Sequence, residues 1–352
     1  MTESPKKPDA PLVDLDRLNQ WSQLGELPGE GPVESLTRLT GGAQNLLFTM
    51  TRADGTELVL RRPGRYAGPE AAGPFIRESR VLTALSGTDV PHPRLHGYSV
   101  DDSVIGVPFS VLEKIDGFMP RGQLPGTYGT DLEWRRKLAF ELVGGAAKLA
   151  AVNPDDVGLG DLSKTEDWAQ RQVARYLRNL HAYRETEGYR ETESPMVDPI
   201  SDWLKANAPG DVHIGFVHGD LQFANVMFKH DAPELAAIVD WEMTSLGDPL
   251  LDLAWILTAW REAGDPPGSD PQLQPWEGMP SRAELVEYYG KLTGRDTTGF
   301  RWFQVLACFR LASLLEGSYV RSLGGKMDAG LGRGLHDYAA WLWTLAAQEV
   351  GL

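Results

Sequence analysis

The segment Phe216–Phe228, with the sequence FVHGDLQFANVMF, constrains this chain more than any other stretch because it sets an Asp and an Asn at a fixed spacing after a short apolar run. Asp220 is separated by four residues from Asn225. A second apolar run, Leu235–Val239, ends at Asp240. We interpret the two runs as short buried strands, whose ends place oxygen ligands side by side, the arrangement that Mg²⁺ prefers.

The spacing of Asp220 and Asn225 is the D-x-x-x-x-N pattern typical of a phosphoryl-transfer loop. In such a loop the Asp takes or orients the proton of an acceptor hydroxyl, and the Asn oxygen holds magnesium. We therefore expect Asp220 to be the catalytic base and Asn225 and Asp240 to be metal ligands. An Asp at a strand end is most often a turn or cap residue, so the prediction depends on all three residues occurring within a 25-residue window.

The chain resembles the aminoglycoside-phosphotransferase-type small-molecule kinases, which share a bilobal α+β fold with protein kinases and choline kinases. The resemblance covers most of the chain. It is strongest to the kinase-like domain of some acyl-CoA dehydrogenase family proteins, where stretches similar to Leu58–Pro63, Val152–Leu159 and Gly247–Trp255 recur. It implies a small β-rich N-lobe over residues 1–113, with an N-terminal helix, a nucleotide-binding sheet and an αC-like helix, and a larger, mainly helical C-lobe over residues 114–352. ATP and Mg²⁺ are the implied cofactors, and a small-molecule hydroxyl is the implied acceptor.

Four residues of the expected N-lobe are candidates for holding the nucleotide phosphates. Gly41 and Gly42 interrupt a strand pattern, where their backbone amides would approach phosphates, although a plain hairpin turn explains two glycines equally well. By the resemblance, Arg61 takes the place of the lysine that grips the α- and β-phosphates, and Glu78 is its partner. A solvated helix glutamate is the alternative for Glu78. Arginine is not equivalent to lysine there, because its guanidinium is a planar fork and not a point charge.

The resemblance also gives roles to residues around the loop and the hinge between lobes. Glu113 would lie near the adenine. His218 would brace the loop by hydrogen bonding, and Asp252 would turn inward to brace its backbone, which a buried carboxylate can do only if it is hydrogen-bonded. Asp248 is expected to cap the helix that carries Asp252. Glu242 either approaches a second metal or the acceptor, or is a solvated residue after the strand.

Apolar residues at helical spacing predict an amphipathic helix over Leu12–Leu27 and a largely helical second half of the chain. The helices expected there span residues 132–151, 168–184, 200–207, 250–262, 282–292, 302–322 and 335–350. The glycine-rich stretch Gly330–Gly334 is interpreted as a flexible turn, since no strand precedes it. Cys308 is the single cysteine and lies in an apolar helical stretch, so we expect an inert core thiol and no intrachain disulfide.

Composition excludes several classes of function. A net charge of −15 argues against nucleic-acid binding, which needs basic patches. The first residues lack the apolar core of a signal peptide, and no apolar run reaches membrane-spanning length, so a cytoplasmic protein without membrane contact is expected. The seven histidines are dispersed and form no cluster with the cysteine, which leaves magnesium on oxygen ligands as the only implied metal. The oligomeric state stays open.

The acceptor also stays open at this point. An aminoglycoside would need a ring of carboxylates. A hydroxyacyl-CoA thioester would need a basic surface, for which Arg171, Arg175 and Arg178 on one helix face are candidates, the alternative being a solvated helix. A hypothesis of another class is a non-catalytic nucleotide-binding scaffold. The replacement of lysine by Arg61 supports it, and the complete set of base and metal ligands opposes it.

Overall fold

The computed structural model describes residues 12–23, 25, 27–39, 45–64, 72–189, 196–262, 265 and 273–352. The chain divides into two compact units. The first unit comprises Met1–Gly87 and His92–Asp116, and the second comprises Thr88–Pro91 and Gly117–Leu352. In the stretches that the structure describes, no helix is both long enough and apolar enough to cross a membrane.

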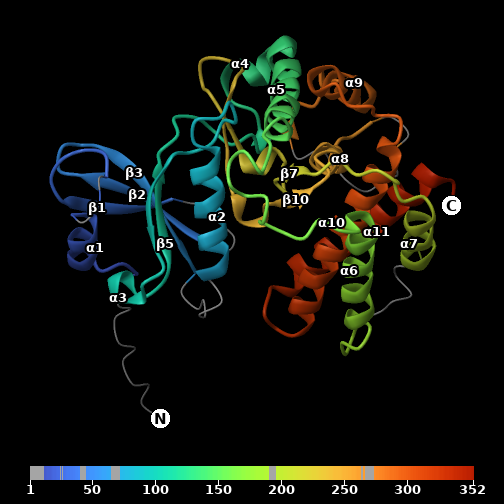
Figure 1. Cartoon of the computed structure of the whole chain (residues 1–352), viewed down its shortest axis with the longest axis horizontal. Coiled ribbons are helices and arrows are strands. Elements are labelled where there is room, and N and C mark those ends of the chain that lie inside the picture. The colour runs from blue at the N-terminus through green and yellow to red at the C-terminus, as the bar shows by residue number, and fades with distance from the viewer. Residues whose placement is uncertain are drawn as a thin grey trace. The chain divides into compact units, whose positions relative to one another are not determined.

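The first unit is built around a five-stranded antiparallel sheet with the strand order β1-β2-β3-β5-β4 (Figure 1). The strands are β1 (Val33–Leu39), β2 (Asn45–Arg52), β3 (Glu57–Pro63), β4 (Leu95–Ser99) and β5 (Phe109–Glu113). Three helices accompany them: α1 (Leu15–Ser22), α2 (Ala72–Leu85) and α3 (Asp102–Ile105). The expected strands on either side of Gly41 and Gly42 are present, while the two glycines themselves lie outside the described residues.

Strand β3 buries side chains on both faces of the sheet, which explains how two consecutive arginines can both be buried. Leu58 and Leu60 belong to an apolar core to which α1 contributes. Arg62 lies on the same face, since side chains alternate along a strand, and its Nη1 donates to the carbonyl of Leu12. Arg61 therefore points to the opposite face, where its guanidinium pairs with a side chain of α2.

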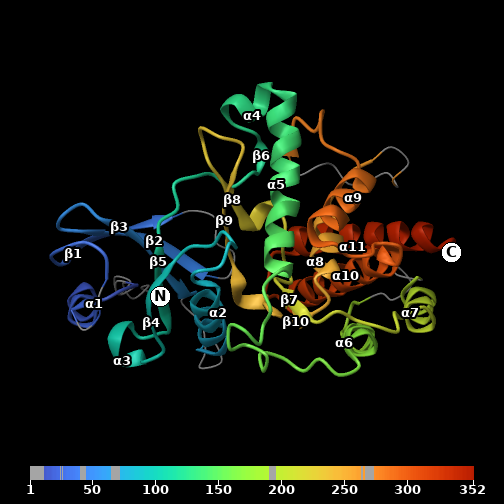
Figure 2. The ribbon, with the colours of Figure 1, turned by 45° about the horizontal axis from the view of Figure 1, so that its top comes forward.

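The second unit is mainly helical. Its helices are α4 (Gly126–Thr130), α5 (Leu132–Ala150), α6 (Trp168–Tyr183), α7 (Val197–Ala206), α8 (Leu250–Thr258), α9 (Arg282–Thr293), α10 (Phe300–Leu323) and α11 (Ala329–Val350). The short strands β6 (Gly122–Gln123), β7 (Gly215–Val217), β8 (Val226–Phe228), β9 (Leu235–Ile238), β10 (Ser245–Gly247) and β11 (Leu273–Gln274) pair as β6-β11, β7-β10 and β8-β9. The two long helices α10 and α11 lie side by side (Figure 2).

Most helices match their predicted ranges within three residues, because their apolar periodicity is a local property of the sequence. Three do not. The N-terminal helix α1 covers only Leu15–Ser22, α8 ends at Thr258 and not at residue 262, and α11 begins at Ala329 and not at residue 335.

The predicted flexible turn at Gly330–Gly334 is wrong, because these residues form the first turns of α11. The side chain of Asp328 caps the helix by accepting a hydrogen bond from the backbone N–H of Leu331 at 2.8 Å. A Cβ atom at Gly332 would lie 1.9 Å from the Ser322 hydroxyl oxygen on α10. Glycine is therefore present so that the two helices can approach closely.

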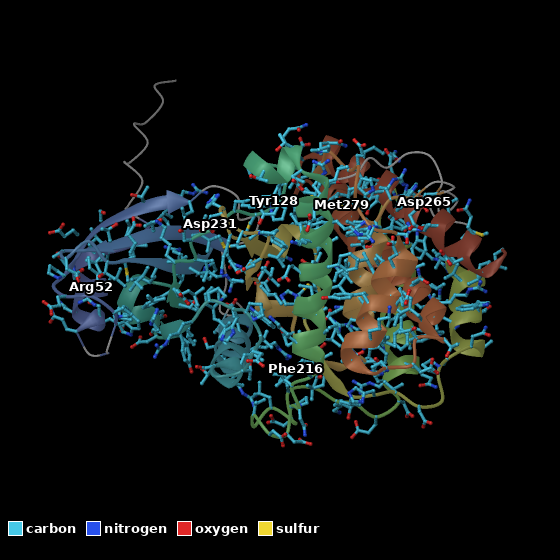
Figure 3. The ribbon with its side chains drawn as sticks, turned by 90° about the horizontal axis from the view of Figure 1, so that it is seen from above. Arg52, Tyr128, Phe216, Asp231, Asp265 and Met279 are labelled. Atoms are coloured by element: carbon cyan, nitrogen blue, oxygen red, sulfur yellow. The ribbon has the colours of Figure 1, made fainter. Side chains whose placement is uncertain are left out.

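The hairpin of β8 and β9, which connects Asn225 to Asp240, is fixed to α4 by Tyr128. The Tyr128 hydroxyl lies 2.9 Å from the carbonyl oxygen of Lys229 and 2.6 Å from that of Ala232. Figure 3 shows Tyr128 near Asp231 in the connection between the two strands. Burial and the nearby carboxylates raise the pKa of Tyr128, so its hydroxyl keeps its proton and can donate to the hairpin backbone.

Candidate active site

Asp252 on α8 holds the backbone at the start of the loop. Its Oδ2 accepts a hydrogen bond from the backbone N–H of His218 at 2.6 Å, and its Oδ1 accepts one from Gly219 at 2.9 Å. Burial raises the pKa of this carboxyl group to about 6, while the two amides and the positive charge of Arg310 act in the opposite direction. Both oxygens of Asp252 are therefore used to shape the turn that precedes Asp220.

His218 is a fixed, neutral link between the loop and the segment that carries Asp240. Its Nε2 lies 3.1 Å from the carbonyl oxygen of Val239, and its Nδ1 accepts from the backbone N–H of Asp220 at 3.3 Å. A carbonyl can only accept and an N–H can only donate, so the imidazole must carry its proton on Nε2. Complete burial lowers its pKa to about 4. With both ring nitrogens engaged, His218 braces the loop and has no free position for proton transfer.

The Asp220 carboxylate is oriented by three side-chain donors. Its Oδ1 accepts from Gln222 Nε2 at 2.7 Å and from Trp255 Nε1 at 3.0 Å, and its Oδ2 accepts from Asn225 Nδ2 at 2.7 Å. Burial raises the pKa of Asp220 and the negative charge of Asp240 adds to this, whereas the three donors favour the ionised form. The result is a basic carboxylate held in one orientation, as proton abstraction requires.

Asn225 lies in the short 3-10 helix η3 (Phe223–Asn225) and has a defined amide orientation. Its Nδ2 donates both to the backbone carbonyl of Asp220 at 2.8 Å and to the Asp220 carboxylate at 2.7 Å. Both partners are acceptors, so the amide nitrogen must face them and Oδ1 must point away. An oxygen turned away from the Asp220 carboxylate is a suitable ligand for a hard cation such as Mg²⁺.

Asp240 adopts a backbone conformation that is unusual for a residue other than glycine. Its φ is +68° and its ψ is +59°, and within the described ranges it is one of two non-glycine residues with a positive φ. The left-handed conformation turns the chain from β9 into the short 3-10 helix η4 (Trp241–Met243), which carries the half-buried Glu242. Because left-handed backbone costs free energy, strain of this kind is found mainly where function needs a particular geometry.

The residues present fit a magnesium ion better than a transition metal. Among the described residues no three His, Cys, Asp or Glu side chains form a metal-binding group. Asn225 and Asp240 together offer one amide oxygen and one carboxylate. Magnesium is typically held by one or two carboxylates together with water and substrate phosphates, so two protein ligands are sufficient for it.

Gly219 is required by the shape of the loop. Its φ is +88°, and a Cβ atom there would lie 2.9 Å from the carbonyl oxygen of Met243 and 3.0 Å from Nη2 of Arg310. Arg310 Nη2 donates to the Gly219 carbonyl at 3.1 Å. The turn therefore needs glycine both for its dihedral angle and for the close approach of its neighbours.

Arg61 and Glu78 form a buried ion pair within the first unit. Arg61 Nη1 donates to Glu78 Oε2, and the two residues are only 5% and 3% exposed. The guanidinium also lies 5.1 Å from the ring centroid of Phe75. Glu78 is thus buried and paired, and the alternative of a solvated helix glutamate is wrong. Glu113 is exposed at the end of β5, where its Oε2 accepts from the backbone N–H of Arg94 at 3.1 Å.

Asp248 is not the N-cap of α8, contrary to the prediction; Pro249 occupies that position. The buried Asp248 carboxylate still accepts from the N–H of Leu250 at 3.0 Å and also pairs with Arg295 Nη2 at 3.0 Å. The helix start is shifted by one residue because the proline ring, with φ of −60°, is already suited to a helical start.

Gln222, Trp255 and Arg310 were missed as site residues at the level of sequence. For Trp255 a signal was available, since it follows Asp252 by three residues and a helix places such residues on one face. For Gln222 the signal was its place inside the loop motif, two residues after Asp220. Arg310 had no signal beyond being a charged residue in an apolar helix.

Comparison with known proteins identifies the family. A family model described as "Phosphotransferase enzyme family" matches residues 35–286. The chain belongs to this phosphotransferase family. It is therefore a kinase-type enzyme that transfers phosphoryl groups to hydroxyl groups of small molecules, and the predicted family is confirmed.

Solved structures confirm the predicted fold class. A putative aminoglycoside phosphotransferase from Ralstonia eutropha is 28% identical, with a TM-score of 0.79 over 96% of this chain and 99% of that one. Macrolide 2'-phosphotransferase MphH from Brachybacterium faecium is 18% identical, with a TM-score of 0.59 over 93% and 97% of the two chains, and shows the fold alone. The chain has the α+β, protein-kinase-like fold of these enzymes.

The curated relatives are longer proteins. Acyl-CoA dehydrogenase family member 10 of Mus musculus is 27% identical over 91% of this chain, and family member 11 of Rattus norvegicus is 28% identical over 85%. The matches span only 30% and 38% of these two relatives. The predicted resemblance to part of some acyl-CoA dehydrogenase family proteins is confirmed.

Proposed function

We propose that the enzyme transfers the γ-phosphoryl group of ATP to an acceptor hydroxyl in a magnesium-dependent reaction. One observation carries this proposal. The Asn225 amide nitrogen donates to both the backbone carbonyl and the carboxylate of Asp220, which orients that carboxylate and directs Asn225 Oδ1 away from it, where it would be available to a metal ion. A single side chain thereby couples the base to the metal ligand set.

In the proposed reaction Asp220 accepts the hydroxyl proton as the acceptor oxygen forms a bond to the γ-phosphorus. The bond between that phosphorus and the β,γ-bridging oxygen breaks, and ADP leaves. Magnesium, when held by Asn225 and Asp240, neutralises charge on the phosphate oxygens. Arg61, oriented by Glu78, would contact the α- and β-phosphates as a planar donor.

Asp220→Asn tests the assignment. It removes the base but keeps an oxygen that Trp255 can bind, so we expect turnover to fall by a factor on the order of 10²–10⁴ with ATP affinity unchanged. ADP release is measured with aminoglycosides, amino alcohols, sugars and hydroxyacyl-CoA thioesters. Asp231→Asn, at an exposed site between β8 and β9, is the matched control and should retain full activity. A fully active Asp220→Asn enzyme would remove Asp220 from the mechanism.

For the acceptor we propose a hydroxyacyl thioester over an aminoglycoside. The exposed Arg121 donates to the carbonyl of Ala224 in η3 at 3.2 Å. An arginine beside the loop repels a polycation and attracts an anion, such as the phosphate groups of a CoA thioester.

The acceptor panel separates the alternatives. ADP release with hydroxyacyl-CoA but not with aminoglycosides supports the thioester, and the reverse result contradicts it. Binding of magnesium ATP without ADP release for every acceptor would favour the non-catalytic scaffold.

A further inference from the structure

A buried arginine far from the loop in sequence reaches the residue next to the catalytic base. Arg310 lies on α10, is 5% exposed, and donates from Nη2 to the carbonyl of Gly219 at 3.1 Å, across a separation of 91 residues. Its guanidinium lies 5.1 Å from the ring centroid of Trp255 and 5.8 Å from that of Tyr176. These contacts place one cation against both the loop backbone and a side chain of α8.

Both contacts continue to Asp220. Gly219 is its neighbour in the chain, so fixing the Gly219 carbonyl fixes the peptide plane from which Asp220 extends. Trp255 donates its indole N–H to Asp220 Oδ1 at 3.0 Å. A guanidinium over an indole ring is attracted to the ring face, and this holds the ring in place. Arg310 therefore restrains the Asp220 carboxylate by two separate routes.

The energetics do not favour a purely stabilising role for this arginine. Burying a guanidinium costs several kcal/mol, and buried ion pairs are often replaced by apolar residues without loss of stability. Arg310 Nε is also buried without a hydrogen-bond partner among the residues that the structure describes. An incompletely satisfied buried cation is more easily explained by the geometry that it imposes on its neighbours.

We infer that Arg310 is a positioning residue for phosphoryl transfer, which sets the orientation of Asp220 through the Gly219 carbonyl and the Trp255 indole. The inference rests on the proposed function. It requires that Arg310 affect the chemical step and not the binding of ATP or acceptor.

The kinetic test compares Arg310→Met, Arg310→Lys and the control Arg301→Met, which removes an exposed arginine from the same helix. Misplacing a catalytic group by about 1 Å can cost about 100-fold, so we expect Arg310→Met to lower kcat by about 10- to 100-fold with KM values within about threefold of wild type. Lysine should restore part of kcat, because its ammonium can still donate to Gly219. Unchanged kcat in a folded Arg310→Met enzyme would overturn the inference, as would an equal loss in Arg301→Met.

A second measurement does not depend on activity. The indole N–H resonance of Trp255 is identified among the 11 tryptophans by its absence in Trp255→Phe. We expect this resonance to shift in Arg310→Met, and less in Arg310→Lys, because the N–H changes its geometry to Asp220. No shift in Arg310→Met would overturn the inference even if no acceptor were phosphorylated. A clear shift of this resonance in Arg310→Met, together with no ADP release by the wild-type enzyme, would support the positioning contact and contradict the proposed reaction. If Arg310→Met does not fold, Arg310→Lys carries both measurements.

Discussion

His218 and Asp252 are neighbours in the buried frame of the loop, and we predict that they give the protein opposite pH dependences of stability. Burial lowers the pKa of His218 from 6.5 to about 4 and raises that of Asp252 from 3.8 to about 6. As the pH falls through 6.5 toward 4, the unfolded histidine gains a proton that the folded one does not, so stability is lost. As the pH rises through 3.8 toward 6, the unfolded Asp252 loses a proton that the folded one keeps, so stability is again lost.

The two effects are of similar size. One pKa unit corresponds to about 1.4 kcal/mol. Each residue therefore changes the free energy of unfolding by about 3 kcal/mol across the pH range between its pKa in the unfolded and in the folded protein. Between pH 4 and 6 the two contributions oppose each other and largely cancel in the wild-type protein. Each becomes visible only when the other is removed.

His218→Gln and Asp252→Asn separate the two contributions. Both are compared with wild type by urea unfolding from pH 4 to 7. With an m-value of about 3 kcal/mol per molar urea, 3 kcal/mol corresponds to about 1 M in the midpoint. Relative to wild type, the midpoint of His218→Gln should rise by about this amount as the pH falls from 6.5 to 4. That of Asp252→Asn should rise as the pH increases from 4 to 6.

The double variant His218→Gln/Asp252→Asn is the control, and its midpoint relative to wild type should be nearly independent of pH between 4 and 6. Single-variant curves that change in the same direction, or that both stay flat, would refute the argument that burial sets these two pKa values.

Two other substitutions test the strained backbone of Asp240 and the buried ion pair of Arg61 and Glu78. Asp240→Gly should raise the free energy of unfolding by about 0.5–1 kcal/mol, because glycine adopts a φ of +68° without strain, and should abolish ADP release by removing the proposed metal ligand. Loss of stability in urea unfolding would contradict the strain argument. Glu78→Gln leaves Arg61 buried without its anionic partner, so we expect a loss of about 3 kcal/mol and a higher KM for ATP. An unchanged melting temperature together with an unchanged KM would show that the pair has neither role.

The parts of the fold that could be predicted are those determined by local patterns. Apolar residues at helical spacing are sufficient to place α5, α6 and α10, since each must bury one face whatever its neighbours are. Local patterns gave the wrong prediction for Gly330–Gly334, which form part of α11. Glycine disfavours a helix by about 1 kcal/mol per residue, but the close approach of Gly332 to Ser322 outweighs that preference.

The same distinction holds for the site. The spacing of Asp220 and Asn225 lies within one loop, so it could be read from the sequence. The donors from Trp255 and the contact from Arg310 come from two helices that reach the loop only in the folded chain. No periodicity in α10 distinguishes Arg310, since an arginine in a largely apolar helix is equally consistent with a side chain extending to solvent.

Buried and exposed residues around the loop should affect the rate and the acceptor specificity differently. Trp255 and Arg310 are at least nine-tenths buried, so an acceptor that enters from solvent has little opportunity to contact them. A substitution at either residue should therefore lower kcat for every acceptor by a similar factor, because it acts through the orientation of Asp220. Arg121 is exposed beside the same loop, and among the described residues no hydrogen bond joins it to Asp220. A substitution that changes the ratio of activities with an anionic and a cationic acceptor must then act at exposed positions such as Arg121. A substitution that lowers all activities by the same factor indicates a change in the orientation of Asp220.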